Sequence, residues 1–513
     1  FTLCRSFYRS QRFLSAIIFI FRRIISHNQN IIFNGLVSYF SIDTLILIMR
    51  FISSLNIVNN IIGNGEIIDS CTNKNDLIKK KRDGWALSNE EIGSLIDGFL
   101  NGQIPDYQMT AFLMAVYFKG MNARECVELT MAMANSGDQV DLSAIQGFKV
   151  DKHSTGGVGD KTTLVLAPLV AASGGIVAKM TGRELGHTGG TVDKLESIPG
   201  LQIELTRDKF TEIVNDVHVS VIAQTASLAP ADRQIYALRN VTATVDAIPL
   251  IASSIMSKKL AAGSDGIVLD VKTGRGAFTT SYEKALHLAK IMVDIGEGAG
   301  RRMVAWITGM EQPLGHAVGN AVEVREAIDT LHGRGPGDLV DLIMELGSDM
   351  LLISGIVSSR NKAKSRIADN LANQKGLKRL VDLIIAQGGD PSVVDNPKLL
   401  PQPTTKIEVK SETHGYVSAL DSLEVGLASK ILGAGRKTKD DPIDYSVGVY
   451  LKKKIGDKVK IGDPLAVLYA DGDEEKIGPA RKKLLTAYSF NPNKINPPKL
   501  IYARVTRDGV EEL

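Results

Sequence analysis

The spacing of apolar positions after residue 75 predicts a series of short helices. Ser88 and Glu91 have the spacing of a helix capping box, and apolar side chains follow them along one helix face. These apolar side chains are Ile92, Leu95, Ile96, Phe99 and Leu100. Two further helical patterns cover residues 107–118 and 123–135, and a glycine follows each closely. A small all-helical domain is therefore expected at the start of the fold.

From residue 148 the pattern changes to short apolar runs, glycine-rich loops and longer helical stretches. The apolar runs cover residues 148–150, 176–180, 219–223, 266–271 and 303–307. Such alternation predicts a larger α/β domain with a mixed or largely parallel sheet. Residues 230–259 open with a Pro-Ala-Asp-Arg turn and contain two amphipathic stretches, which would return the chain to the helical domain. A cleft between the two domains is the expected result.

After residue 403 short apolar runs alternate with Gly-Asp turns, which predicts a β-rich α+β domain at the C-terminus. The runs cover residues 407–409, 415–417, 450–452 and 464–469. The stretch GDKVKIGDPL resembles a turn of biotinyl or lipoyl carriers, but the usual context of the modified lysine is absent. The predicted units are a helical domain (73–140 and 231–261), an α/β domain (141–230 and 262–402) and a C-terminal domain (403–513).

Length and charge limit the possible function classes. A chain of 513 residues exceeds what one hydrophobic core usually supports, and so can hold an active site between domains. Its 60 Lys and Arg against 57 Asp and Glu give no strong positive field, so no nucleic-acid partner is expected. The 3 cysteines have no recognisable spacing, which argues against a disulfide scaffold or a thiolate zinc site.

Residues 1–72 differ from the rest, with apolar bursts, many Asn and Ile residues and very few acids. Their apolar runs are shorter than the roughly 20 residues of a membrane-spanning helix, so no transmembrane segment and no membrane partner are predicted. The arginines and scarce acids are compatible with an organellar transit peptide. Translated upstream sequence outside the folded body is the favoured interpretation, together with a cytoplasmic location.

Residues 151–163 read DKHSTGGVGDKTT and lie between a predicted strand and a predicted helix. Glycines let backbone N–H groups approach an anion, and the helix N-terminus adds positive potential. Lys152, Ser154 and Thr163 supply a charge and hydroxyl donors. Glycines alone would indicate only a tight connection, but their combination with these side chains predicts a phosphate site.

A second glycine-rich stretch, residues 179–196, follows the next predicted strand. It would lie beside the first at the carboxyl edge of the sheet, where α/β proteins bind ligands. Thr181 and Thr191 are expected to donate to the same phosphate. Asp193 and Glu196 are expected to be structural, capping the chain or pairing with the lysine that follows Asp193.

Four stretches together resemble the thymidine and pyrimidine-nucleoside phosphorylase family. They are KHSTGGVGD, TGRELGHTGGTVDKLE, SLAPADRQIYALRNVTATVDAIPLIASSIMSKK and VKTGRGAF, and the resemblance runs roughly from residue 75 to the C-terminus. It implies phosphate-dependent cleavage of uridine, thymidine and deoxyuridine to a free base and (deoxy)ribose 1-phosphate, with no cofactor required for the chemistry. It also implies a homodimer with a closing interdomain cleft, whose ligands are inorganic phosphate and pyrimidine nucleosides.

The resemblance also implies residue roles. Phosphate contacts would come from Lys152, Ser154, Thr163, Thr181 and Thr191, and base contacts from His153, Arg239, Ser254 and Lys258. Negative charge develops on the departing pyrimidine, so Arg239 and Lys258 are predicted to stabilise it. Lone basic residues are usually solvated at the surface, but these two lie within a matching block. Ser254 would read the imide edge of the ring, and His153, if protonated, would donate to a base carbonyl.

Residues 178–181 read AKMT and resemble the pyrimidine-nucleoside branch, which has Lys at position 179. Lys179 is expected to tolerate or contact a ribose 2′-hydroxyl, and Met180 is assigned to the same substrate site. Thr181 replaces the usual Ser and keeps the hydroxyl. Glu184 replaces Gly or Ala, and its carboxylate would repel phosphate unless it points outward or pairs with a nearby arginine. A non-catalytic nucleoside-binding homologue is therefore one alternative.

The resemblance implies a structural potassium site beside the phosphate loop, formed by Gly159, residue 161, Leu314, Ala317 and Glu326. This chain has Lys161 where the branch has Thr. The lysine removes a hydroxyl ligand and adds a positive charge. Its ammonium is predicted to reach Glu326 and replace the ion; alternatively it turns to solvent and the potassium site remains.

A second enzymatic alternative is an anthranilate phosphoribosyltransferase, which shares the architecture and the glycine-rich loop. That enzyme would need magnesium-binding acids for its pyrophosphate leaving group, and residues 263–335 contain no adjacent acidic pair. His187 is interpreted as a packing or hydrogen-bonding residue. The other histidines have no metal-ligand spacing, so no catalytic zinc is expected.

Overall fold

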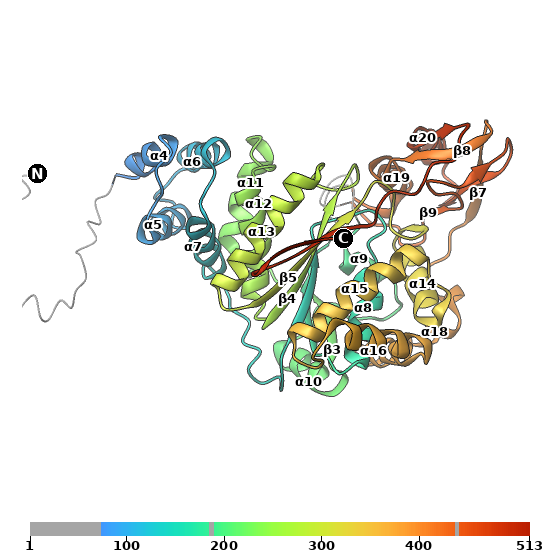
Figure 1. Ribbon diagram of the computed structural model, residues 1–513, viewed down its shortest axis with the longest axis horizontal. Coiled ribbons are helices and arrows are strands. Elements are labelled where there is room, and N and C mark those ends of the chain that lie inside the picture. Colours follow the sequence, from blue (N-terminus) through green and yellow to red (C-terminus); the bar gives the residue numbers. More distant parts are fainter. Residues whose placement is uncertain (1–72, 184–188, 437–440) are drawn as a thin grey trace, which may run out of the picture. The chain divides into compact units, whose positions relative to one another are not determined.

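The computed structural model describes residues 73–183, 189–436 and 441–513, and the predictions on 1–72, Glu184 and His187 lie outside this part of the chain. The helical domain contains α4 (Lys74–Arg82), α5 (Asn89–Leu100), α6 (Asp106–Lys119), α7 (Ala123–Ala134), α11 (Pro230–Val241) and α12 (Ile248–Ala261) (Figure 1). The predicted capping box is confirmed: Glu91 N donates to Ser88 Oγ (3.2 Å), and Ser88 N donates to Glu91 Oε2 (2.7 Å). It satisfies two N–H groups that the first turn of α5 leaves free.

Helices α11 and α12 return the chain to the helical domain as predicted, but two details differ. Pro230 is the first residue of α11, so the Pro-Ala-Asp-Arg stretch forms a helical turn rather than a separate turn. Proline suits this position because its missing N–H has no helical acceptor there. Helix α12 is buried on most of its surface instead of being amphipathic, because it packs against both α7 and α13 (Tyr282–Gly298).

The predicted α/β sheet is confirmed. Its strands are β1 (Val150–Ser154), β2 (Val177–Thr181), β3 (Val219–Ala223), β4 (Gly266–Thr273) and β5 (Arg302–Gly309). β1, β4 and β5 pair in parallel, as do β2 and β3, and Val150 N donates to Ile176 O (2.9 Å) between the two groups. The strand expected at 148–150 begins later and continues through Ser154. Pairing of Val150–Ser154 with β4 sets these limits, and it carries the KHS motif to the strand end.

Helices cover both faces of the sheet. Ile267 and Leu269 of β4 pack in a cluster with α13, whereas Val268 between them packs in the cluster that includes α15 (Gly337–Ile353). This alternation follows from the two-residue repeat of a strand. The remaining segments are α8 (Thr162–Ala172), α9 (Thr191–Glu196), α10 (Arg207–Val217), α14 (Ala321–Asp329), η1 (Thr330–Arg334), α16 (Arg360–Ala372), α17 (Lys375–Ala386), α18 (Ser392–Asp395) and η2 (Pro397–Leu399).

The C-terminal domain is β-rich, as predicted. It contains β7 (Thr405–Lys410), β8 (Gly415–Leu420), α19 (Ser422–Ser429), η3 (Lys430–Ala434), β9 (Gly448–Leu451), β10 (Lys458–Val459), β11 (Pro464–Ala470), α20 (Glu474–Ala487) and β12 (Tyr488–Asn491). β6 (Ala317–Gly319), from the α/β part of the sequence, pairs with β9 and so joins the two domains.

The predicted boundary 403–513 is wrong at its end. β13 (Ile501–Thr506) pairs antiparallel with β5, and β14 (Gly509–Glu512) pairs with β13, so both strands extend the α/β sheet. Pairing there covers the open edge of β5, which would otherwise expose unpaired backbone groups. Among the described residues, no helix is long and apolar enough to cross a membrane.

Candidate active site

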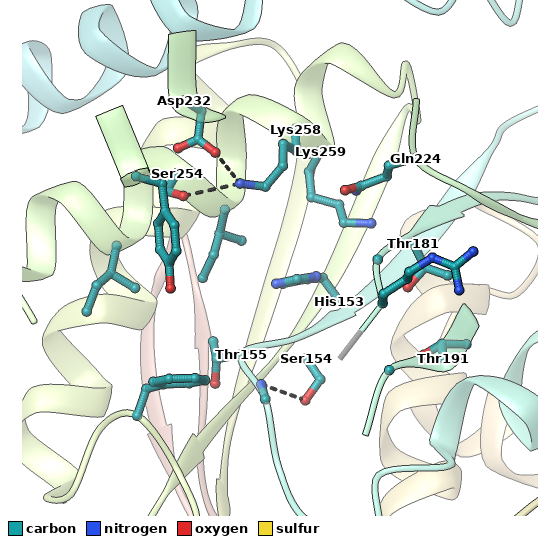
Figure 2. Close-up of a pocket in the computed structure, with 18 of the residues that line it drawn as sticks. His153, Ser154, Thr155, Thr181, Thr191, Gln224, Asp232, Ser254, Lys258 and Lys259 are labelled. Carbon is teal, nitrogen blue, oxygen red and sulfur yellow. Dashed lines mark hydrogen bonds and ion pairs between the residues drawn. The ribbon is translucent and has the colours of Figure 1, made fainter. Parts of the chain in front are cut away.

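A cavity of about 570 Å³ lies where the α/β loops meet helices α11 and α12. Its lining includes residues at or just after the carboxyl ends of β1, β2 and β3, which is the edge where α/β sheets bind ligands. Figure 2 shows Asp232, Ser254 and Lys258 on the helical side of the cavity, in the upper part of the view. Ser154 and Thr191 lie across from them, in the lower part. The volume is typical of a small-molecule site.

The loop between β1 and α8 lies against the ends of β4 and β5. Thr155 N donates to Asp270 O (3.0 Å), and Lys272 N donates back to Thr155 Oγ1 (2.9 Å). Gly157 packs against Met310, whose Cε would lie 2.6 Å from an added Cβ and would have to shift to accommodate it. Thr163, in the first turn of α8, lines the cavity, so the helix N-terminus faces it as an anion site requires.

Most residues predicted for the substrate site line this one cavity. They are Lys152, His153, Ser154, Thr163, Lys179, Thr181, Thr191, Arg239, Ser254 and Lys258. Met180 does not: its side chain packs with Leu142 and Phe210 in an apolar cluster. Side chains alternate along β2, so Lys179 and Thr181 face the cavity while Met180 faces away. Its assignment to the substrate site is wrong.

The Lys152 ammonium lies under the loop in a buried charge network. Nζ is 3.4 Å from Asp160 Oδ2 and 3.5 Å from Asp270 Oδ2, and it donates to Thr162 Oγ1. Burial favours a neutral Asp160, but the charges of Lys152, Lys272 and Lys194 outweigh it and hold the pKa of Asp160 well below its usual value. Lys152 therefore adds positive charge beneath the loop and, through these contacts, helps to fix the conformation of the loop.

Asp151 holds two lysines at the cavity floor. Its Oδ1 accepts from Lys179 Nζ (3.0 Å), and its Oδ2 accepts from Lys259 Nζ (2.8 Å). Although burial favours the neutral acid, these ammonium groups lower the pKa of Asp151 to about 2. Burial and the repulsion of Lys259 and Lys152 lower the pKa of Lys179 to about 8, despite Asp151.

The geometry of Lys179 differs from the expected contact with a ribose hydroxyl. Besides Asp151, Nζ donates to the Lys152 carbonyl, and the residue is only 3% exposed. Its donors are thus directed into the protein. Lys259 makes a similar inward contact with the Met180 carbonyl (2.9 Å).

His153 lies at the centre of the cavity in Figure 2, close to Lys259. Burial, followed by the positive charges of Lys259 and Lys179, holds the pKa of His153 well below its usual value. The imidazole is therefore neutral near pH 7, which corrects the expectation of a protonated donor. A neutral ring still offers one N–H, so His153 can donate one hydrogen bond to a ligand.

On the helical side, Lys258 Nζ pairs with Asp232 and donates to Ser254 Oγ (3.1 Å), as the dashed lines in Figure 2 show. Arg239 is 1% exposed, and its guanidinium donates to Leu250 O (3.0 Å) and Val245 O (2.6 Å). Neither cation is a freely solvated surface group. Through these bonds Arg239 holds the start of α12 in place. The charge of Lys258 lies at the wall of the cavity that α11 and α12 form.

The acids of the second glycine-rich stretch are structural, but their partner is not Lys194. Arg183 donates to Glu196 (2.6 and 2.9 Å) and to Asp193 (3.3 Å). Lys194 instead pairs with Glu323 (2.9 Å) and donates to the Asp160 carbonyl (2.7 Å), which connects α9 to the loop between β1 and α8.

The residues of the implied potassium site come together around Lys161. Its Nζ donates to Leu314 O (2.9 Å), Ala317 O (2.8 Å) and Glu326 Oε2 (2.5 Å). The alternative in which Lys161 turns to solvent is wrong, since its side chain is 0% exposed. Gly159 lies against the same segment, and its carbonyl accepts from the Lys161 N–H (3.0 Å).

The sequence interpretation missed Asp232, Lys259 and Asp151. Asp232 lies seven residues before Arg239, two turns apart on one face of α11, which is a helical spacing that was available from the sequence. The pairing of Asp151 with Lys259 spans 108 residues and leaves no local signal. Within the described ranges, no group of three or more His, Cys, Asp or Glu side chains could hold a metal ion.

Comparison with known families agrees with this architecture. The helical bundle domain of the glycosyl transferase family matches residues 75–137, and the a/b domain of that family matches residues 146–377. The pyrimidine nucleoside phosphorylase C-terminal domain matches residues 416–491. A crystal structure of anthranilate phosphoribosyltransferase from Thermus thermophilus aligns with a TM-score of 0.50 and 19% identity, covering 61% of this chain and 99% of that chain. That likeness concerns the fold alone.

The sequence relatives are much closer. The pyrimidine-nucleoside phosphorylase of Geobacillus stearothermophilus is 53% identical over 431 residues, covering 84% of this chain and 99% of that protein. The pyrimidine-nucleoside phosphorylase of Bacillus subtilis (strain 168) is 52% identical over 433 residues, with the same coverage of 84% and 99%. Such identity over nearly the whole length of both relatives establishes that this chain belongs to the pyrimidine-nucleoside phosphorylase family of glycosyltransferases.

Proposed function

We propose that the protein cleaves uridine, thymidine and deoxyuridine with inorganic phosphate, releasing the pyrimidine base and (deoxy)ribose 1-phosphate. The observation that carries the proposal is a single cavity lined on one side by the glycine-rich loop before α8 and on the other by Ser254, Lys258 and Arg239. The reaction needs these two features together, because an anion must approach the sugar while the base departs with negative charge.

On the phosphate side, the loop after β1 and the start of α8 provide backbone N–H groups and hydroxyls. Ser154, Thr181 and Thr191 lie around this region and are proposed donors to the phosphate oxygens. One phosphate oxygen forms the new bond to the anomeric carbon while the bond from that carbon to the base breaks. Holding both substrates in one cavity makes this step effectively unimolecular.

On the base side, the bonding electrons leave with the pyrimidine. Lys258 is the proposed electrostatic stabiliser, because its ammonium lies at the cavity with Ser254 as a neighbour. Asp232 is a positioning residue that holds Lys258 on the helical wall. Neutral His153 is proposed to donate one hydrogen bond to a base carbonyl. No step requires a metal ion or a covalent enzyme intermediate.

The test incubates the purified protein separately with uridine, deoxyuridine and thymidine, with and without phosphate, and follows base and sugar 1-phosphate by chromatography. Phosphate-dependent release from all three nucleosides is expected. Release from thymidine but not uridine at matched concentrations would contradict the broad sugar specificity. Saturable nucleoside binding without any release would instead identify a non-catalytic binding protein. The cytoplasmic location remains a prediction.

A further inference from the structure

The Lys161 ammonium lies in a buried group of oxygen atoms behind the phosphate loop. An ammonium has three N–H donors, and the carbonyls of Leu314 and Ala317 with the carboxylate of Glu326 provide one acceptor for each. Glu326 also accepts the N–H of His316 (3.0 Å) and of Ala317 (3.2 Å). All three donors of the Lys161 ammonium therefore have acceptors, and this group of oxygen atoms is complete without a further ligand.

A second lysine holds the same segment from the C-terminal domain. Lys454, between β9 and β10, donates to Pro313 O (2.9 Å) and Gly315 O (3.0 Å) and pairs with Asp338. Residues 313–317 include the end of the connection from β5 and the first residue of β6, and each lysine binds two carbonyls of that segment and one nearby carboxylate. The phosphate loop and the C-terminal domain are thus connected through one segment by two ammonium groups.

The residues do not fit the potassium ion that the family resemblance implies. An ion in contact with the same three oxygens would have to lie where Lys161 Nζ lies, at 2.8 to 2.9 Å from the two carbonyl oxygens. Two positive charges at contact distance repel each other strongly in a buried site. The one carboxylate of the group, from Glu326, already balances the lysine.

We propose that Lys161 acts as a built-in monovalent cation, which braces the phosphate loop against residues 313–317 so that no potassium ion is bound there. The Lys161 ammonium is paired with the Glu326 carboxylate, and each of its three donors has an oxygen acceptor. The ammonium consequently stays charged throughout the neutral range. Order in the loop is then independent of the potassium concentration.

The first experiment measures thermal unfolding of the full chain in potassium chloride and in tetramethylammonium chloride at constant ionic strength. The unmodified protein is expected to unfold at the same temperature in both salts. In Lys161→Thr the unfolding temperature is expected to rise with potassium alone, by roughly 1.5 °C for each tenfold increase above the dissociation constant. Phosphorolysis by this variant should show the same saturable dependence.

Lys81→Thr is the matched control. Lys81 also forms a buried ion pair, with Glu125 at 2.9 Å and side chains 3% and 2% exposed, but both its hydrogen bonds go to that one carboxylate. This variant should lose stability without a specific response to potassium. An equal potassium response in Lys81→Thr and Lys161→Thr would overturn the proposal, because the response would not require the oxygen group.

The second measurement does not depend on the folding of any variant or on the proposed reaction. Equilibrium dialysis of the unmodified protein with radioactive rubidium, a potassium substitute, is expected to show no saturable binding. Binding of one rubidium ion per chain, or strong activation of the unmodified protein by potassium, would show that Lys161 has not replaced the ion.

Discussion

Single residues set the charge of the cavity floor, which holds more lysines than acids. Its buried network contains Lys152, Lys179, Lys259 and Lys272 against Asp151, Asp160 and Asp270. Buried charges are tolerated where each has a partner of opposite sign. The remaining positive charge favours an anion in the adjacent loop and disfavours a second proton on His153.

This environment predicts how His153 affects stability at low pH. The pKa of His153 is depressed in the folded state, so the unfolded chain takes up this proton first as the pH falls below about 6.5. The stability contributed by the neutral ring is complete above that pH and is lost below it, by at most about 1.4 kcal/mol per pH unit. Urea unfolding of His153→Gln should therefore have a shallower pH dependence than the unmodified protein between pH 5 and 6.5. His287→Gln, at an exposed position, should not differ from it.

Lys258→Ala tests charge stabilisation on the base side. Loss of one preorganised donor to the developing charge should lower kcat/KM by about 100- to 1000-fold, in line with 2.7 to 4 kcal/mol for comparable donors. Arg239→Ala should also lower activity, but it would release backbone carbonyls and lower stability as well. Steady-state kinetics measure both variants. Lys284→Ala, which removes an exposed lysine on α13, is the control for the change in net charge. Unchanged turnover in Lys258→Ala would remove this residue from the mechanism.

Asp232→Asn examines the positioning of Lys258. The amide keeps the size of the side chain but weakens its hold on the ammonium. A smaller loss of kcat/KM than in Lys258→Ala is expected. In the double variant the two losses should not add, because both act through one ammonium. Additive losses would show that Asp232 acts independently.

At the scale of elements, the site depends on how closely segments approach one another. Gly159 has φ +74°, and an added Cβ would lie 2.6 Å from Leu314 O and 3.1 Å from Ala317 O. These two carbonyls are also acceptors for Lys161. A side chain at this position would push the loop between β1 and α8 away from the segment that contains Leu314 and Ala317.

Gly159→Ala is therefore expected to raise the KM for phosphate and to lower the unfolding temperature. Gly102→Ala is the matched control, because Gly102 has φ +70° but no atom within 4 Å of an added Cβ. The control should show only the strain of a left-handed residue, about 1 to 2 kcal/mol. If both variants had the same KM for phosphate, close packing behind the loop would not matter for binding.

At the scale of the whole molecule, the α/β sheet is completed by the last residues of the chain. Arg504 of β13 donates to Asp349 of α15 (2.7 and 3.0 Å), and Trp306 of β5 donates to the same carboxylate (2.9 Å). The C-terminus thus stabilises the sheet that supports the active site.

The helical domain has exposed aromatic side chains on its surface. The expected homodimer can be tested at this surface. Tyr107 and Phe118 are each 73% exposed and lie eleven residues apart on α6, about three turns, so they share one face. Exposed aromatic groups of this kind are typical of protein contacts. Light scattering after size exclusion should show a dimer that Phe118→Asp weakens. Ile461→Asp, at a position 68% exposed in the C-terminal domain, should leave the dimer intact. A monomer in every case would contradict the prediction.

The sequence by itself determined most helices and strands, the order of domains and many of the residues that line the cavity. These depend on neighbours along the chain: the capping box at Ser88, the apolar runs of the strands and the glycine loop after β1. The alternation along β2 would also have excluded Met180, since it follows from strand geometry alone.

Only the tertiary structure decided which charges meet and which strands close the sheet. Lys161 and Glu326 are 165 residues apart, and Asp151 and Lys259 are 108 apart, yet these pairs determine the bracing of the loop and the protonation of the cavity floor. The pKa of His153 likewise depends on Lys259 and on burial. Electrostatic energies depend on distance in space and on exclusion of water, and neither quantity is encoded in the local pattern of a segment.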